Sequence, residues 1–212
     1  MTPDHTLALD SLALDSLALG VTLGKVADTR DPEGYGRVKV SFVLKGAEIE
    51  SDWAQITSFF AGPNTGALFL PQIGDSALLA FANGDPSKPY VIGFLWNGAQ
   101  KPPVPTDSQQ DVRVIRTRNG KTITLDDSPN GGGVTIVDAK QNRIQIDTSS
   151  NTISLSSEGD LSITAKGTLT LTGSQVTVRN TAGNVKASLG EASLALQGGQ
   201  SLKLTATMID LN

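Results

Sequence analysis

The sequence lacks most of the residues that carry enzyme chemistry. It contains no cysteine, which excludes a disulfide framework, thiolate catalysis and thiolate metal binding. It contains one histidine, His5 in the N-terminal tail, so a Ser-His-Asp triad or a zinc or haem site is not expected. The phosphate-binding patterns GxGxxG and GxxxxGKS/T are also missing. We therefore expect no enzymatic activity, no cofactor and no metal site.

The sequence also lacks a large net charge and long apolar runs. The formal net charge is −4, and basic and acidic residues nearly balance within 21–105. No basic stripe is available to neutralise phosphates, so no nucleic-acid partner is expected. No apolar run approaches the roughly 18 residues of a membrane span. The start MTPDH has no basic region, and Asp10 and Asp15 interrupt the leucines that follow, so no signal peptide is predicted.

Aromatic residues are missing from one half of the chain. All of them lie between Tyr35 and Trp96, and residues 97–212 contain none. Because large rings anchor globular cores, we expect a globular first half and a second half that buries its apolar surface differently. The change falls at KPPVPT (101–106), which is typical of a stiff linker. The predicted organisation is an N-terminal arm (1–20), a first domain (21–105) and a second domain (106–212).

The first domain contains short apolar segments of the kind that form strands. GRVKVSF (36–42) places Val38 and Val40 on one face of a strand. SALLAF (76–81) and YVIGFLW (90–96) are more continuously apolar and are typical of buried strands. Turn signals separate the segments at 31–36, 62–66 and 83–89. About five or six short strands in this length predict a small closed all-β barrel.

The second domain repeats on a short period. In SSNTISLSSEGDLSITAKGTLTLTG (149–173) apolar pairs recur roughly every eight residues between Ser, Thr and Gly, which predicts stacked short strands. Region 181–193 breaks the period and is expected to hold a loop. The residues predicted to face inward and to form a trimer core are Ile144, Ile146, Ile153, Leu155, Leu161, Ile163, Leu169, Leu171, Val176, Val178, Leu194, Leu196, Leu202 and Leu204.

These aliphatic residues predict self-association. Each strand offers two or three inward side chains, which stabilise little unless both sides are covered. The chain carries no aromatic layer to cover them, and a single sheet would expose its apolar face to water. Three identical sheets that close into a triangular prism would meet on a threefold axis, where Ile, Leu and Val fit. A monomeric β-solenoid is the alternative.

Two further features have competing interpretations. The arm sequence LALDSLALDSLAL (7–19) has a five-residue period, which makes no single stripe on a helix and flips faces in a strand. It is either an extended segment that binds a partner or a disordered tail. The leucines of the N-terminal arm, called the arm leucines below, are Leu7, Leu9, Leu12, Leu14, Leu17 and Leu19.

The pairs Asp126/Asp127 and Glu158/Asp160 could serve a glycosidase, but they lie at predicted turns where acids are ordinarily solvated.

The first domain resembles the oligosaccharide/oligonucleotide-binding-type (OB) barrel of contractile-tail spike proteins, the phage baseplate assembly protein V family. The second domain is similar to the trimeric β-helix of the same spikes, which are related to the type VI secretion spike. The segments that carry the first resemblance are Gly24-Lys25-Val26, DPEGYGRVKV (31–40), Trp53, LPQIGD (70–75), NGDPSKPYVIG (83–93) and Trp96-Asn97. Those that carry the second are NGKTITLDD (119–127), NRIQID (142–147) and GDLSITAKG (159–167).

The resemblance implies a structural central spike of a contractile tail or injection particle. The homotrimer would dock on a separate hub protein through its barrel end and pierce the target envelope on sheath contraction. The arm leucines would contact the hub. Met208, Ile209 and Leu211 would contact a separate PAAR-repeat tip protein, because the sequence ends without the histidine-rich tip of some spikes. Assembly would take place in the bacterial cytoplasm, as part of a phage tail or phage-like injection particle.

Two alternative functions remain open at this point. A carbohydrate-binding or adhesive tail-fibre-like module would predict aromatic residues on the surface of the second domain, where the sequence has none. A polysaccharide or peptidoglycan hydrolase would need the acidic pairs. Some phage spikes insert a lysozyme domain after the barrel, and KPPVPTDSQQD (101–111) is too short to hold one.

Overall fold

The computed structural model describes residues 20–182 and 184–201, and their regular structure is almost entirely strand. The all-β class predicted from the sequence is therefore confirmed. The two short 3-10 turns are η1 (Ala82–Gly84) and η2 (Thr106–Ser108). The first group of strands comprises β1 (Val21–Asp28), β2 (Lys39–Leu44), β3 (Ala47–Glu50), β4 (Gln55–Ile56), β5 (Ala61–Gly62), β6 (Thr65–Gly66), β7 (Ser76–Phe81) and β8 (Pro89–Phe94).

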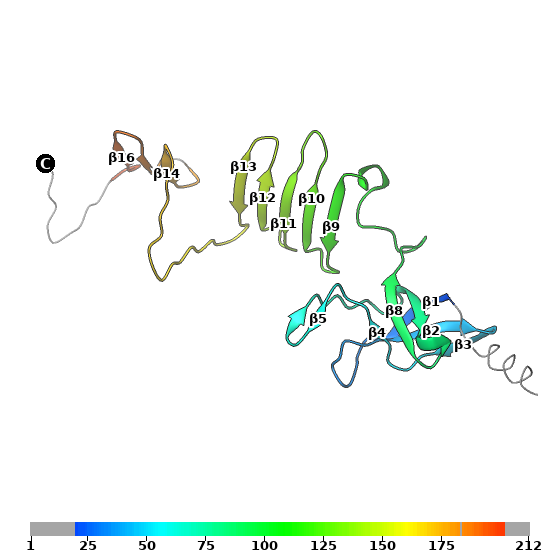
Figure 1. The fold of residues 1–212 in the computed structure, drawn as a ribbon. Coiled ribbons are helices and arrows are strands. Elements are labelled where there is room, and N and C mark those ends of the chain that lie inside the picture. Colours follow the sequence, from blue (N-terminus) through cyan, green and yellow to red (C-terminus); the bar gives the residue numbers. More distant parts are fainter. Residues whose placement is uncertain (1–19, 183, 202–212) are drawn as a thin grey trace, which may run out of the picture. The chain divides into compact units, whose positions relative to one another are not determined.

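Six of these strands form one curved sheet in the order β3-β2-β1-β7-β8-β4 (Figure 1). The pairs are antiparallel except for β4 and β8, which run parallel. A bridge outside the strands joins the residue before β2 to the residue before the edge strand β4, because Val38 N donates to Ala54 O at 3.0 Å and Ala54 N donates to Val38 O at 2.8 Å. This bridge closes the sheet into the small barrel that the sequence predicts.

The barrel interior is aliphatic and tightly packed. Val38 and Val40, which the alternation placed on one face, are fully buried, so that prediction is confirmed. Gly24 in β1 allows a close approach of strands, because a Cβ there would lie 2.8 Å from Ser41 O. The buried apolar residues are Val26, Val38, Val40, Phe42, Ala54, Ala77, Leu79 and Val91, with Leu44, Ile49, Ile56 and Phe81 packed against them.

Truncating the core leucine should destabilise the barrel strongly. Leu79 is 0% exposed, so Leu79→Ala is expected to lower the free energy of unfolding by about 2–5 kcal/mol. The matched control is Leu23→Ala, which removes the same atoms from a side chain that is 64% exposed. Urea unfolding followed by tryptophan fluorescence reports this region alone, because Trp53 and Trp96 are the chain's tryptophans. Equal midpoints for the two variants would contradict the burial of Leu79.

The expectation that the rings anchor the core is wrong for most of them. Phe42 is buried and Phe81 packs beside it, with ring centroids 5.3 Å apart. Phe59, Phe60, Phe69 and Trp96 are all exposed in the single chain. β8 is likewise buried on one face only, since Tyr90, Ile92 and Phe94 point outward. The interior of the small barrel is filled mainly by Val, Ala and Leu, and Phe42 is its one buried ring among the described residues.

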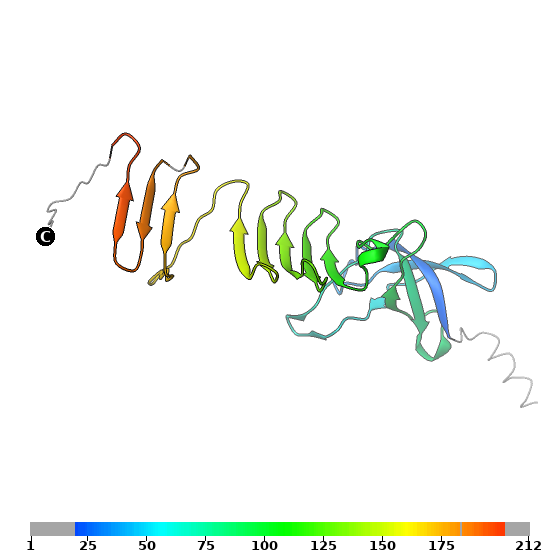
Figure 2. The ribbon, with the colours of Figure 1, turned by 90° about the horizontal axis from the view of Figure 1, so that it is seen from above.

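The second part of the chain forms two antiparallel meanders, which Figures 1 and 2 show as rows of neighbouring strands. In the first meander each strand pairs with the next one in the sequence. Its members are β9 (Val112–Arg116), β10 (Thr122–Asp126), β11 (Gly133–Val137), β12 (Arg143–Asp147) and β13 (Thr152–Ser156). The members of the second meander are β14 (Val176–Arg179), β15 (Lys186–Leu189) and β16 (Leu194–Gln197).

The structure of the single chain differs from two expectations about the repeat. β15 lies within 181–193, where we expected a loop, and it is the central strand of its sheet. Conversely, no strand is assigned between β13 and β14, although Leu161, Ile163, Leu169 and Leu171 have the alternation of strands. Hydrogen-bond partners decide whether an extended segment is a strand, and periodicity does not specify those partners.

The described chain divides into two compact units. The first contains the barrel and the β9–β13 sheet, and the second begins at Ser156, contains the β14–β16 sheet and also includes Lys140–Asn142. The domain limits 1–20, 21–105 and 106–212 stay a prediction. Among the described residues, no helix has the length and apolar character needed to cross a membrane.

Candidate functional site

The first candidate site is an aliphatic face on the β9–β13 sheet. Strand register places Ile115, Ile123, Ile136 and Ile144 opposite one another in one continuous row. Because successive residues of a strand point to opposite faces, these side chains share one face of the sheet. A second row on that face contains Leu125, Val134 and Ile146, and at β9 it holds Arg113.

The opposite face of the same sheet is polar. Thr124, Thr135 and Gln145 are register partners there, and Thr122 pairs with Val137. From β10 to β13 each strand thus alternates aliphatic and largely polar residues, the pattern of a sheet that covers something apolar on one side. β9 departs from this pattern, since Val112 and Val114 lie on the opposite face. We call the aliphatic side of β9–β13 the shaft face.

The shaft face is open to solvent in a single chain. Its isoleucines and leucines range in exposure from 41% at Ile123 to 78% at Ile153. A row of exposed branched side chains this long is unusual for a protein surface, and marks an interaction site. Among the described residues, the buried hydrophobic cluster lies in the barrel and contains no residue of the shaft face.

The β14–β16 sheet repeats the same arrangement. Val176, Leu189 and Leu194 form one row, and Val178, Ala187 and Leu196 form a second row beside it. The other side of the sheet carries Ser188, which is buried and lies 3.3 Å from the Gln175 amide nitrogen. This second aliphatic face is described by itself, because it belongs to the other compact unit.

The structure distributes the predicted core residues over three regions. Ile144, Ile146, Ile153 and Leu155 lie in β12 and β13, while Val176, Val178, Leu194 and Leu196 lie in β14 and β16. Leu161, Ile163, Leu169 and Leu171 lie in the segment between the sheets and are exposed. Leu202 and Leu204, the arm leucines and the three residues assigned to tip docking lie outside the described residues. The trimer-core role of the predicted core residues stays a prediction, and so do hub docking by the arm leucines and tip docking by Met208, Ile209 and Leu211.

The list of predicted core residues omitted several members of the two faces. Ile115, Val134, Ala187 and Leu189 occupy register positions within the aliphatic rows. Val134 and Ile136 alternate in the sequence, so that signal was present. In KASL the alternation is only Ala187 and Leu189, which is too short to identify β15.

Two acidic residues of the repeat, Asp126 and Asp147, act as turn formers. The Asp126 carboxylate accepts hydrogen bonds from the hydroxyl and the backbone N–H of Ser128, and the first of these is the main cause of its lowered pKa. Asp147 accepts from Ser150 N at 2.9 Å and from the Ser149 hydroxyl at 2.8 Å, and its pKa is lowered as well. Carboxylates held in this way close the loops between strands. No group of three or more metal-ligating side chains occurs among the described residues.

The loop that carries DPEGYGR is ordered around one carboxylate. Asp31 accepts hydrogen bonds from Arg37 Nη2 at 2.8 Å, from Arg37 Nε at 3.0 Å and from the backbone N–H of Tyr35 at 2.9 Å. The backbone N–H groups of Glu33 and Arg37 also donate to it. Gly34 and Gly36 supply the positive φ that the loop requires, at 72° and 73°. The side-chain hydrogen bonds from Arg37 are the main reason that the pKa of Asp31 lies well below its usual range.

Neutralising this carboxylate should loosen the loop in a pH-dependent way. Asp31→Asn is expected to lower Tm by about 5 °C at pH 7, because the Arg37 guanidinium loses its anionic partner. A depressed carboxylate pKa stabilises the fold fully above about pH 4 and loses that effect as the pH falls through the folded-state pKa. The Tm difference between variant and parent should therefore shrink below pH 4. Asp52→Asn, at an exposed position, serves as the control.

Two family models match the chain. Residues 22–96 match the type VI secretion system/phage-baseplate injector OB domain. Residues 112–186 match the phage baseplate V C-terminal trimerisation domain. The first match covers the closed barrel, and the second covers the shaft face and the first strand of the second sheet.

Curated relatives are similar over parts of the chain. The type VI secretion system spike protein VgrG1a of Pseudomonas aeruginosa is 31% identical over 108 residues, 48% of this chain and 17% of the relative. VgrG5 of the same organism is 29% identical over 117 residues, 53% of this chain and 14% of the relative. The actin cross-linking toxin VgrG1 of Vibrio cholerae is 30% identical over 103 residues, 43% of this chain and 9% of the relative. The chain thus corresponds to less than a fifth of the length of these relatives.

Fold and matches together define the class: an injector-type OB domain followed by a trimerisation domain, as in the spikes of contractile injection systems. The two matches span more than half of the chain, which belongs to the phage baseplate V family, related to the type VI secretion spikes. The resemblance stated from the sequence is confirmed.

Proposed function

We propose that three copies of the chain associate through their shaft faces into a triangular prism. The observation that carries this proposal is the continuous row Ile115, Ile123, Ile136 and Ile144, which a single chain leaves in water. Burying such rows on a threefold axis contributes about 25 cal/mol for each Å² of apolar surface removed from water. The match to a trimerisation domain over residues 112–186 supports the same assembly.

The segment 157–175 extends the proposal to backbone pairing between chains. It alternates like a strand and yet belongs to no sheet of the described single chain. Backbone N–H and C=O groups of a strand-like segment are costly to leave unpaired once they are buried. We infer that copies of this segment from the three chains pair with one another, so that the prism is interwoven between the two meanders.

The trimer is proposed to act as the central spike of a phage tail or phage-like injection particle assembled in the bacterial cytoplasm. Its barrel end, with the arm leucines, would dock on a separate hub protein. The opposite end, with Met208, Ile209 and Leu211, would receive a PAAR-repeat tip protein. Sheath contraction would then drive the prism through the target envelope. The relatives named as spike proteins support this role.

The proposed role is mechanical and not enzymatic. The carboxylates of Asp126 and Asp147 accept hydrogen bonds that close the turns between strands, which is a structural role. Stacked strands about 4.8 Å apart resist shear because many backbone hydrogen bonds must break together. One relative is named a toxin, but its match covers only 9% of that protein.

The first test is the mass of the purified chain in solution. Light scattering coupled to size exclusion should give three times 22.1 kDa with an elongated hydrodynamic shape. A compact species of 22.1 kDa would show that the shaft face is covered within one chain. That result would overturn the prism, and the spike role with it.

A further inference from the structure

A long uncharged segment projects from the barrel. Residues 55–74 contain no Asp, Glu, Lys or Arg, and their central part, 57–70, forms a hairpin that we call the arm hairpin. Phe59 is 91% exposed and Leu68 is 77% exposed. Phe60, Phe69 and Leu70 are exposed as well. Aromatic residues without charges are typical of the buried centre of a protein interface.

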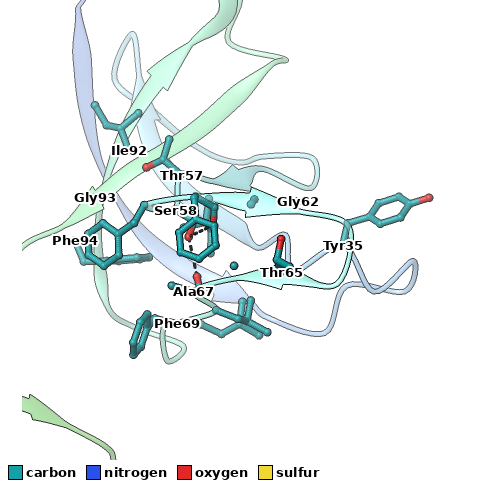
Figure 3. A pocket seen from close by; sticks show the side chains of 18 of the residues that line it. Tyr35, Thr57, Ser58, Gly62, Thr65, Ala67, Phe69, Ile92, Gly93 and Phe94 are labelled. Atoms are coloured by element: carbon teal, nitrogen blue, oxygen red, sulfur yellow. Dashed lines mark hydrogen bonds between the residues drawn. The ribbon is translucent and has the colours of Figure 1, made fainter. Parts of the chain in front are cut away.

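The arm hairpin has a defined backbone but little support of its own. Its ladder consists of two residue pairs, Ala61 with Gly66 and Gly62 with Thr65. At its base the Ser58 hydroxyl donates toward Ala67 O at 2.7 Å and Phe60 O at 3.2 Å, as Figure 3 shows. A two-stranded hairpin without a core is marginally stable in water. The arm hairpin therefore needs a second surface to pack against.

The hairpin and the outer side of the barrel enclose an apolar pocket. Its volume is about 840 Å³, and Ile56, Ile92 and Phe94 line it from the barrel. Phe60, Leu68 and Phe69 line it from the arm hairpin. Figure 3 shows Ile92, Gly93 and Phe94 on one side and the hairpin that bears Thr65 and Ala67 on the other. Of these side chains only Ile56 also packs against the barrel core.

The short linker between the barrel and the shaft would keep the three barrels of a trimer close together, so that one barrel can fill the pocket of another. Only residues 97–111 separate the barrel match from the trimerisation match, which restricts each barrel to about 50 Å from the start of its shaft. Three barrels tethered to one trimer therefore meet at an effective concentration in the millimolar range. An uncharged apolar surface meets its own copy without electrostatic repulsion, and a cyclic trimer allows each copy to offer one surface and receive another.

We propose that the arm hairpin of each copy packs against a neighbouring copy. The neighbouring copy fills the apolar pocket, and the three barrels thereby close into a ring. The proposal rests on the proposed trimer and adds a second interface to the shaft face. A hub protein or a lipid surface would be the other possible occupants, and both would leave the arm hairpin free in the isolated trimer.

Photo-crosslinking of the full-length chain tests this interface. The photoreactive amino acid p-benzoylphenylalanine replaces Phe59 in one variant and Tyr90 in the control variant. Tyr90 is an aromatic position on the outward side of β8 that does not line the pocket. After irradiation, the Phe59 variant should give covalent dimers and trimers on a denaturing gel, and the Tyr90 variant only single chains. Mass spectrometry of trimers mixed from light and heavy isotope-labelled chains should then find crosslinks that join the two labels.

The mass of each variant separates the two ways of failing. A Phe59 variant that weighs three times 22.1 kDa but yields only single chains would overturn the ring and leave the prism intact. Crosslinks that appear only after a hub protein or phospholipid vesicles are added would also overturn it. A variant and parent that both weigh 22.1 kDa would refute the proposed trimer itself.

Discussion

Ile144→Asp should convert the trimer into single chains. Ile144 lies at the β12 position of the isoleucine row, next to Ile136 in register. In a prism, threefold symmetry would bring three carboxylates to the axis, where each unpaired buried charge costs several kcal/mol. We expect the mass to fall from three times 22.1 kDa to 22.1 kDa at micromolar concentration.

The neighbouring residue supplies the control. Gln145 points to the opposite face of β12, where its register partner is Thr135. Gln145→Asp introduces the same charge one residue away and should leave the trimer mass unchanged. Ile144→Val, which keeps a branched aliphatic side chain, should also remain trimeric, because it removes one methylene at about 0.5–1.5 kcal/mol. Dissociation by Gln145→Asp, or a trimeric Ile144→Asp, would place the interface elsewhere.

Much of the barrel could be predicted from local sequence. Val38 and Val40 alternate with Arg37 and Lys39, and one residue of register decides which face is buried. That the sheet closes between β2 and β4 could not be predicted, because the Val38–Ala54 bridge joins segments that have no pattern in common. Closure depends on long-range pairing, which periodicity does not encode.

The aromatic residues show a different limit. Composition places all rings in the first half, and from that we expected them in its core. The structure leaves Phe59, Phe60 and Trp96 exposed. A hydrophobic side chain seeks burial, but the sequence does not state whether its own domain or another chain supplies the cover. The uncharged run 55–74 was the available signal, since a monomeric surface seldom lacks charge for that length.

The repeat region illustrates the same limit in the backbone. Alternation in Leu161/Ile163 and Leu169/Leu171 is as regular as in Ile153/Leu155, yet only the last pair lies in a strand of the single chain. Side-chain pattern reports which residues share a face. It does not report which chain provides the hydrogen-bond partner, and that choice separates a meander from an interwoven prism.

Hydrogen exchange should show the largest difference in the segment 157–175. In the trimer, we expect the amides around Leu161–Leu171 to exchange about a thousandfold more slowly than in Ile144→Asp single chains, which corresponds to ~4 kcal/mol of opening free energy. The physical reason is that, in the proposal, their partners come from other copies. Amides in β10 and β11 pair within one chain and should lose far less protection.

The protection of 157–175 compared with that of β10 and β11 shows whether the backbone ladder continues between the two meanders. If 157–175 exchanged freely in a trimer of three times 22.1 kDa, the two meanders would be joined by an unpaired segment, and shear along the shaft would concentrate there. A spike could not transmit a contraction load through such a joint. Slow exchange in the trimer with fast exchange in the single chain would instead show that the backbone ladder continues through the segment. The strength of the shaft would then depend on assembly, since no isolated chain could form it.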